Sequence, residues 1–407
     1  MALLGRVFAR AVRPGVTSYL FAGQMLAAGV AFLVNILAAS VMDPSERGVL
    51  ALLLQIAYLL TVAVLLGAER PFIASRQGSF PEMMGEFQRL VRPGWWFVLL
   101  PGAAAGYFFV HGDFHLWIAM SLLAVYLVCN ALGRAIRIAY ITSGTVTQFV
   151  WSTVSSQGGL LLLSVLLVLL NVDDPNVWFA AYTATALIML GIAFLNTRRL
   201  RGPVSDDLLV IRLRGMKLIP ASFGNSAMLR SDRLLLPLLA SSAQLGIYVV
   251  VATVMEIGTW PVQQWADASL RRWSSKDFHS HRRVFFLIAK AGLVVLIITI
   301  LCGILALIVV RSLLEPEYLP AQELIVPLGV AAIFYGMSRV QQGVLIAQGH
   351  AGRVSVVEMT GMIASVVAYI ALIPLWGAMG AAVGSLLGYG ICLSAGAIAL
   401  WSSGRGQ

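Results

Sequence analysis

Apolar runs of about 20 residues recur along the whole chain, and they restrict its fold more than any other feature. A helix rises about 1.5 Å per residue, so a run of this length crosses the roughly 30 Å hydrocarbon core of a bilayer. Only 11% of the residues are charged, against about 25% in a soluble domain. The chain is therefore predicted to be a polytopic membrane protein.

We expect an all-α fold with about twelve transmembrane helices, because a helix satisfies all of its backbone hydrogen bonds within the bilayer. The predicted spans, with ends accurate to a few residues, are 17–41, 48–68, 94–112, 115–140, 146–170, 177–197, 216–239, 244–268, 285–310, 322–347, 353–376 and 378–402. The longest polar stretches, 69–92 and 196–217, have the length of loops. No soluble domain is expected between the spans.

The positions of the 28 Lys and Arg residues predict the orientation of the chain. If the chain starts in the cytoplasm, all of them face that side except Arg47, Arg311, Arg230 and Arg233. Cytoplasmic loops carry an excess of Lys and Arg, so both termini of this inner-membrane protein are predicted to be cytoplasmic. The net charge of +10 follows from this topology. We expect no nucleic-acid partner, because no folded domain gathers the charge on one face.

Two segments that lie 198 residues apart are similar to each other. They are NILAASVMDPSERGVLALLLQIA around Gly48 and RLLLPLLASSAQLGIYVVVATVMEI around Gly246. Each consists of an apolar helix, a short turn of small and polar residues, a glycine and a second apolar helix. This pattern predicts two six-helix halves related by a parallel repeat, residues 1–200 and 201–407, which the basic loop at 198–217 joins.

Two motifs also carry a resemblance to a known family: DPSERG between two apolar helices, and RSDRLLLPLLASSAQLGIY at the opening of the second half. With them the chain resembles the O-antigen type polysaccharide flippases of the multidrug/oligosaccharidyl-lipid/polysaccharide exporter superfamily. The resemblance implies two six-helix lobes around a central cavity. It also implies a lipid-linked oligosaccharide of the undecaprenyl-diphosphate type as cargo, moved to the periplasmic leaflet. Membrane lipids and other polysaccharide assembly proteins are the further partners implied.

Span seven contains three charged residues, in LRSDRLLL. A charge at mid-bilayer costs about 2.5 to 3.5 kcal/mol, so these side chains are not expected to face lipid. Arg230 and Arg233 share a helix face, whereas Asp232 points to nearly the opposite side. Two interpretations of the arginines are open. They form a salt bridge with a coupling acid, Glu256 or Asp267, or they recognise a diphosphate or acidic sugar.

Other spans carry polar residues at helical spacing, which predicts polar faces that converge on a cavity. These stripes are Gln24 and Asn35 in span one, Tyr126, Asn130, Arg134 and Arg137 in span four, Glu256, Trp260, Gln263 and Asp267 in span eight, and Tyr335, Ser338, Arg339 and Gln342 in span ten. The cations suit phosphate, and the amides and aromatic rings suit sugars. For Arg134, Arg137 and Arg339, anchoring of a helix end at the membrane boundary is the alternative interpretation.

A cation-coupled multidrug exporter of the same superfamily is the first alternative function. Such a transporter needs a buried acid in its amino-terminal half. Asp43 is the only acid of span one and lies at its outer end, and spans two to six lack a central carboxylate. The candidate cavity residues are mainly arginines, which favours an anionic cargo over a cationic drug.

A membrane-embedded polysaccharide polymerase or ligase is the second alternative. Such an enzyme presents acid/base or metal groups at a membrane face, commonly on a large outer loop, and this sequence has none. His111, Asp113 and His115 lie in a short outer turn, HGDFH, which is more typical of an interfacial turn than of a metal site. We therefore expect no catalytic residues, no metal and no cofactor.

Overall fold

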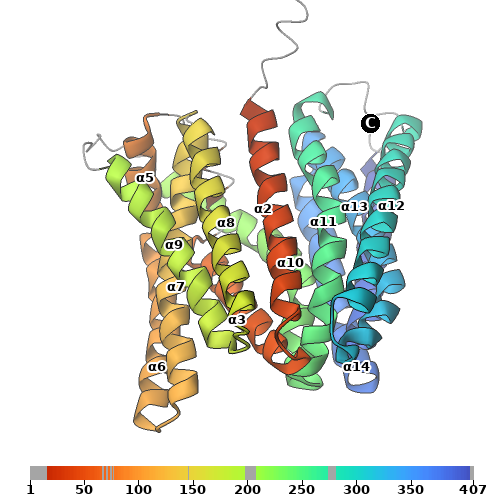
Figure 1. Ribbon diagram of the computed structural model, residues 1–407. Helices are drawn as coiled ribbons and strands as arrows, with labels where there is room; N and C mark the ends of the chain where they lie inside the picture. Colours follow the sequence, from red (N-terminus) through yellow and green to blue (C-terminus); the bar gives the residue numbers. More distant parts are fainter. Residues whose placement is uncertain are drawn as a thin grey trace, which may run out of the picture.

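The computed structural model describes residues 16–403, apart from 67, 70, 71, 74, 75, 77, 145, 198–207 and 274–280. The described residues form α-helices and short 3-10 helices joined by turns, and no β-strand occurs among them (Figure 1). The predicted all-α class is confirmed. The proposed boundary between residues 200 and 201 lies outside the described residues.

The described part of the first half contains eight helical elements. They are α2 (Val16–Ala39), α3 (Pro44–Val64), α5 (Phe80–Val91), η1 (Arg92–Val98), α6 (Leu99–Val110), α7 (Phe114–Thr142), α8 (Val146–Leu169) and α9 (Pro175–Thr197). The second half contains α10 (Leu208–Leu239), α11 (Ser242–Trp273), α12 (His281–Ser312), η3 (Pro316–Leu324), α13 (Ile325–Ala347) and α14 (Ala351–Ser403). Each of the twelve predicted spans coincides with helix in this arrangement.

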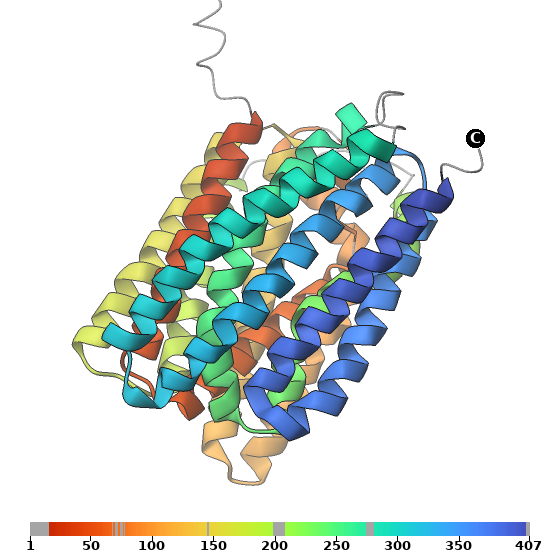
Figure 2. The same cartoon turned by 90° about the vertical axis from the view of Figure 1, so that its right-hand side faces the viewer.

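The helices run side by side as one bundle, in which the start of α2 and the end of α14 lie at the same end (Figures 1 and 2). Among the described residues, 8 segments are long and apolar enough to cross a membrane. The last of them covers almost all of α14 and therefore contains two of the predicted spans. Helices α2, α9 and α10 run alongside these segments through the depth of the bundle. This arrangement supports about twelve transmembrane helices.

The break between the last two predicted spans lies at Gly377. Its φ of 55° and ψ of −127° interrupt α14, and a residue with a Cβ rarely adopts such a positive φ. The Gln244 Oε1 atom accepts a hydrogen bond from the Ala378 backbone N–H at 2.8 Å. The side chain at the start of α11 thus satisfies a backbone donor that the break leaves free.

Helix α5 lies within a stretch that the sequence predicted to be a loop. Ser79 and Glu82 form a capping box at its start, and Pro81 occupies the first turn. Its inner face is apolar, and Phe87 packs edge-on against Phe72. The capping box is a recognisable helix-start signal in the sequence. The helix itself is too short and too polar to cross a bilayer, so it was not among the predicted transmembrane spans.

The two halves share one apolar core along α3, α10 and α11. Ala51 of α3, Leu236 of α10 and Tyr248 of α11 belong to the same cluster of buried side chains, which Tyr369 of α14 also joins. Small residues at this contact let the helix backbones approach closely, as is usual between membrane helices. The junction therefore brings residues of both halves together, and the candidate functional site lies there.

Candidate functional site

Three charged side chains meet at the junction of the two halves. The Glu256 carboxylate on α11 accepts a hydrogen bond from Arg233 and lies 3.1 Å from the Arg230 Nη1 atom. Both arginines are on α10, and their spacing of three residues places them on one face of that helix. The Glu256 side chain is 23% exposed, against 18% for Arg230 and 10% for Arg233. The predicted salt bridge between spans seven and eight is present, and it leaves one positive charge in excess.

Tyr58 of α3 links the two halves at this point. The guanidinium carbon of Arg230 lies 5.1 Å from the centre of the Tyr58 ring. The guanidinium carbon of Arg134, on α7, lies 5.1 Å from the same ring centre. Such distances are within the range of cation–π attraction. A single tyrosine in an apolar span gave no sequence signal, so this contact was not predicted.

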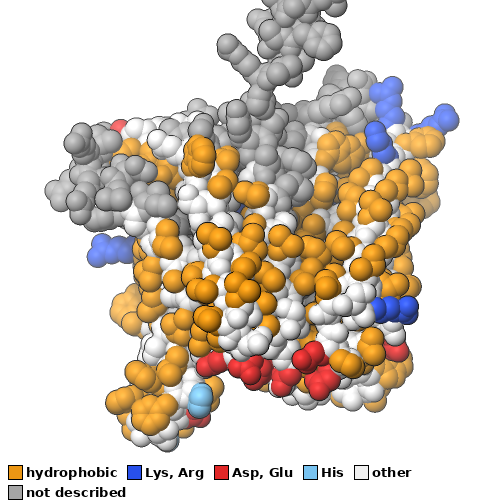
Figure 3. Space-filling view, viewed as in Figure 1, with side chains coloured by type: hydrophobic (Ala, Val, Ile, Leu, Met, Phe, Trp, Pro, Cys, Tyr) orange, Lys and Arg blue, Asp and Glu red, His pale blue; other side chains and the backbone are white. Residues whose placement is uncertain are grey.

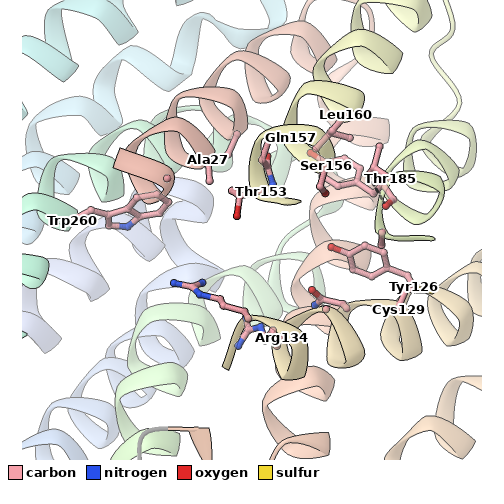
Figure 4. Close-up of a pocket in the computed structure, with 17 residues that line it drawn as sticks. Ala27, Tyr126, Cys129, Arg134, Thr153, Ser156, Gln157, Leu160, Thr185 and Trp260 are labelled. Carbon is pink, nitrogen blue, oxygen red and sulfur yellow. Dashed lines mark hydrogen bonds between the residues drawn. The ribbon is translucent and has the colours of Figure 1, made fainter. Parts of the chain in front are cut away.

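A cavity of about 390 Å³ opens beside Arg134. Its lining consists of Gly23, Ala27, Ala31, Tyr126, Cys129, Asn130, Gly133, Arg134, Arg137, Thr153, Ser156, Gln157, Leu160, Tyr182, Thr185, Ala186 and Trp260. Figure 4 shows Tyr126 and Arg134 on one side and Thr153, Ser156 and Gln157 on the other. All but Trp260 of α11 come from the first half of the chain. The four residues of the predicted span-four stripe thus line one cavity.

The charge of this lining has one sign. Of the described residues that line the cavity, only Arg134 and Arg137 are charged. Glu69, 3.8 Å from the Arg134 Nη1 atom and 35% exposed, is a distant and solvated partner. Hydroxyl and amide groups of Thr153, Gln157 and their neighbours complete the polar surface. The cavity therefore offers cations and neutral hydrogen-bonding groups to a ligand, which is the chemistry of a site for an anion that carries hydroxyl groups.

Asp232 points away from the two arginines of its helix, as the helical spacing predicted. Its carboxylate accepts a hydrogen bond from the Tyr248 hydroxyl at 2.5 Å, and it is 2% exposed. The Ser385 hydroxyl lies 3.4 Å from that of Tyr248 and 2.9 Å from that of Tyr369. The aspartate thus belongs to a hydroxyl cluster inside the second half, and it does not line the described cavity.

The predicted stripe of span ten lies inside the second half as well. Arg339 is 8% exposed, and its Nη1 atom donates to Gln342 at 2.7 Å and to Glu358 at 3.3 Å. The Tyr335 hydroxyl donates to Asn225 at 3.3 Å. These residues do not line the cavity that Arg134 and Arg137 border. Instead, α14 brings an acid, Glu358, against α13, and Arg339 pairs with it. An acid within an apolar span was the signal that could have revealed this pair.

Asn35, predicted as a cavity residue, is 3% exposed at the junction of the halves. Its Oδ1 atom accepts a hydrogen bond from Arg47, and its Nδ2 atom donates to the Val250 carbonyl at 3.5 Å. Gln24 and Asp267 lie in α2 and α11, but their side chains are outside the described part of the structure.

Arg47 is predicted to lie on the outer side of the membrane, just before the span at 48–68, whereas the structure places it inside a helix. Its side chain is buried between the two halves, with 5% of its surface exposed. Helix α3 starts at Pro44, four residues before the predicted span. Arg47 therefore already belongs to the first turn of the helix, where it faces inward.

No group of three or more His, Cys, Asp or Glu side chains suited to hold a metal ion occurs among the residues that the structure describes. The predicted absence of a metal and of a cofactor stays a prediction.

No family model matches the chain, and no curated protein sequence matches it. Solved structures do match its fold. An inward-facing multidrug resistance MATE family transporter of the MOP superfamily aligns with a TM-score of 0.69 at 12% identity, over 94% of this chain and 95% of the other. An outward-facing transporter of that family gives 0.64 at 14% identity, over 96% of both chains. The lipid II flippase MurJ gives 0.62 at 9% identity, over 93% and 86%. At these identities the comparison establishes a shared fold.

Proposed function

We propose that this chain is a flippase that moves a lipid-linked oligosaccharide of the undecaprenyl-diphosphate type from the cytoplasmic to the outer leaflet, for cell-surface polysaccharide biosynthesis. The observation that carries the proposal is the lining of the cavity. Arg134 and Arg137 are the charged residues among the lining side chains that the structure describes, and they stand among hydroxyl, amide and aromatic groups. A diphosphate needs cations, whereas sugars need hydrogen-bonding groups and ring faces.

The contact at Tyr58 extends this cationic surface across the junction. Arg134 from one half and Arg230 from the other approach the same ring. Arg230 and Arg233 share one ion-pair partner, Glu256. A diphosphate between the halves would interact with both lobes at once, and rocking of the lobes around it would carry the head group from one leaflet to the other.

A multidrug exporter is the second candidate, since the solved MATE transporters include the structure that aligns with a TM-score of 0.69. A cavity of about 390 Å³ also has the volume of a drug site. The two functions differ in the charge they require. The two arginines among the described lining residues would repel a cationic drug and attract an anionic cargo.

The remaining assignments belong to the same proposal. The distribution of Lys and Arg supports an inner-membrane protein with both termini in the cytoplasm. In the space-filling view, acidic side chains line the end of the bundle away from the termini (Figure 3). No group among the described lining residues favours a polymerase or ligase.

The test is deletion of the gene in its native host, followed by identification of the lipid-linked intermediate that accumulates. Complementation then uses Arg230→Ala, Arg230→Lys and Arg134→Gln, with Arg311→Gln as the control, because Arg311 is exposed and its side chain bonds to the Gln322 amide. Normal membrane abundance with lost export in Arg230→Ala and Arg134→Gln supports the proposal, and Arg230→Lys should keep partial export because the charge remains. Full export by both neutral variants, or drug resistance as the only phenotype of the deletion, would overturn it.

A further inference from the structure

Arg47 is a buried cation, and most of the nitrogen atoms of its guanidinium have no hydrogen-bond acceptor. Its Nη2 atom donates to the Asn35 Oδ1 atom, whereas its Nε and Nη1 atoms have no partner. The side chain is 5% exposed. A buried guanidinium that lacks partners is costly, so buried charges in proteins are nearly always compensated by a counter-ion or by further hydrogen bonds.

Among the described residues, no carboxylate forms an ion pair or a side-chain hydrogen bond with Arg47. The ionisable groups that interact with it are Tyr182, Tyr318 and Arg233, and neither tyrosine is charged at neutral pH. Arg233 shares the Glu256 carboxylate with Arg230. Arg47 also lies in the first turn of α3, where the helix dipole adds positive potential. The described contacts of Arg47 therefore leave its positive charge without a counter-ion.

Arg47 is next to the cavity, on the side away from the chain termini. Tyr182, which interacts with Arg47, also lines the cavity. Ala31 lines the cavity as well, and Asn35 follows it by one turn toward the end of α2. Arg134 lies in the part of α7 nearer the chain termini, whereas Arg230 and Arg233 lie in the later part of α10 and Arg47 lies at the start of α3, at the opposite end of the bundle.

We propose that Arg47 and Asn35 form a second anion-binding site, which takes a phosphate-type oxyanion beyond the cavity. The site rests on the proposed function in one respect: the oxyanion is the diphosphate of the cargo as it leaves the cavity. Free inorganic phosphate offers the same chemistry, and the test separates the two sources. In the conformation described, Asn35 also bonds across the junction to the Val250 carbonyl, so access to Arg47 accompanies separation of the lobes at this end.

The experiment measures thermal unfolding of the purified full-length protein in detergent, titrated with pyrophosphate or with inorganic phosphate in a gluconate buffer. Native protein should show a Tm that rises and saturates with the oxyanion. Arg47→Gln should lose the part of this response that comes from the second site, and in Arg47→Lys that part should need about tenfold more anion because the planar fork is lost. Arg311→Gln is the control and should respond as the native protein does.

Asn35→Asp is the decisive variant, because it places a carboxylate against Arg47. It should raise the Tm in the absence of anion and abolish the part of the response that Arg47→Gln abolishes. A stronger response to pyrophosphate than to phosphate identifies the cargo head group, and an equal response identifies free phosphate. No anion response in the native protein, an unchanged response in both Arg47 variants, or a lower Tm in Asn35→Asp with its response intact would overturn the proposal. Arg230→Gln, titrated in parallel, reports separately on the site of the proposed function.

Discussion

Gly48 and Gly246 occupy equivalent positions on α3 and α11, and each lies against the first residue of the other helix. A Cβ on Gly48 would come within 1.8 Å of the Ser242 carbonyl oxygen, and a Cβ on Gly246 within 1.9 Å of the Pro44 carbonyl oxygen. The two similar sequence segments thus meet each other through their glycines, with two-fold reciprocity. The contact holds the lobes together at the end of the bundle away from the termini.

Alanine at either glycine should separate this crossing. The clash is with backbone, which cannot rotate away, so Gly48→Ala and Gly246→Ala should each lose stability by at least about 1–3 kcal/mol, the usual range for overpacking. Tm in detergent and export in the native host are the readouts. Gly102→Ala is the matched control, since a Cβ there meets nothing within 4 Å. Native Tm and export in both junction variants would show that the crossing is not needed.

Tyr58 should act through its ring and not through its hydroxyl. Tyr58→Leu removes two cation–π contacts, each worth about 0.5–2 kcal/mol, from Arg134 and Arg230. We expect a lower Tm and reduced export. Tyr58→Phe keeps the ring and is expected to behave as the native protein. A loss in Tyr58→Phe equal to that in Tyr58→Leu would contradict this account.

Arg339 is expected to stabilise the second half rather than to contact cargo. Arg339→Gln leaves Glu358 buried without its cation, which should cost about 3–5 kcal/mol of stability. Arg339→Gln combined with Glu358→Gln should recover most of the loss, because two neutral amides need no counter-charge. Membrane abundance and Tm report the outcome. Normal abundance with lost export in the single variant would instead support the cavity role that the sequence predicted.

Asp43 should stabilise the start of α3 in a pH-dependent way. The backbone N–H of Glu46 donates to its carboxylate and lowers the pKa of Asp43 below the usual value of 3.8, an effect that the Ser45 hydroxyl reinforces. A lowered pKa means that the contribution is present above pH 3.8 and is lost as the pH falls through the folded value.

Asp43→Ala should therefore cost about 1 kcal/mol at pH 7, as loss of an N-cap usually does. The difference in Tm between native protein and variant should shrink as the pH is lowered below 3.8. Asp43→Asn is the control, because asparagine caps helices as well as aspartate does but does not titrate. A native-to-alanine difference that is constant with pH would exclude the charge as its source.

The sequence alone determined the class of fold, the approximate helices and the face that each polar stripe shares. These follow from local rules: a backbone in hydrocarbon must be helical, and residues three or four apart lie on one side. The rules also predicted that Arg230 and Arg233 point to the same side of their helix. They predicted one stripe of Tyr126, Asn130, Arg134 and Arg137, and in the structure these four residues line one cavity.

Only the tertiary structure decided which partner each polar side chain meets. Arg230 and Arg339 looked alike in sequence, yet α11 brings Glu256 to the junction of the halves, and α14 brings Glu358 into the second half. Arg47 precedes the predicted span at 48–68, yet α3 starts at Pro44 and the Arg47 side chain is buried in its first turn. Pairing depends on how helices from distant parts of the chain pack, and helical periodicity carries no information on which helix lies opposite.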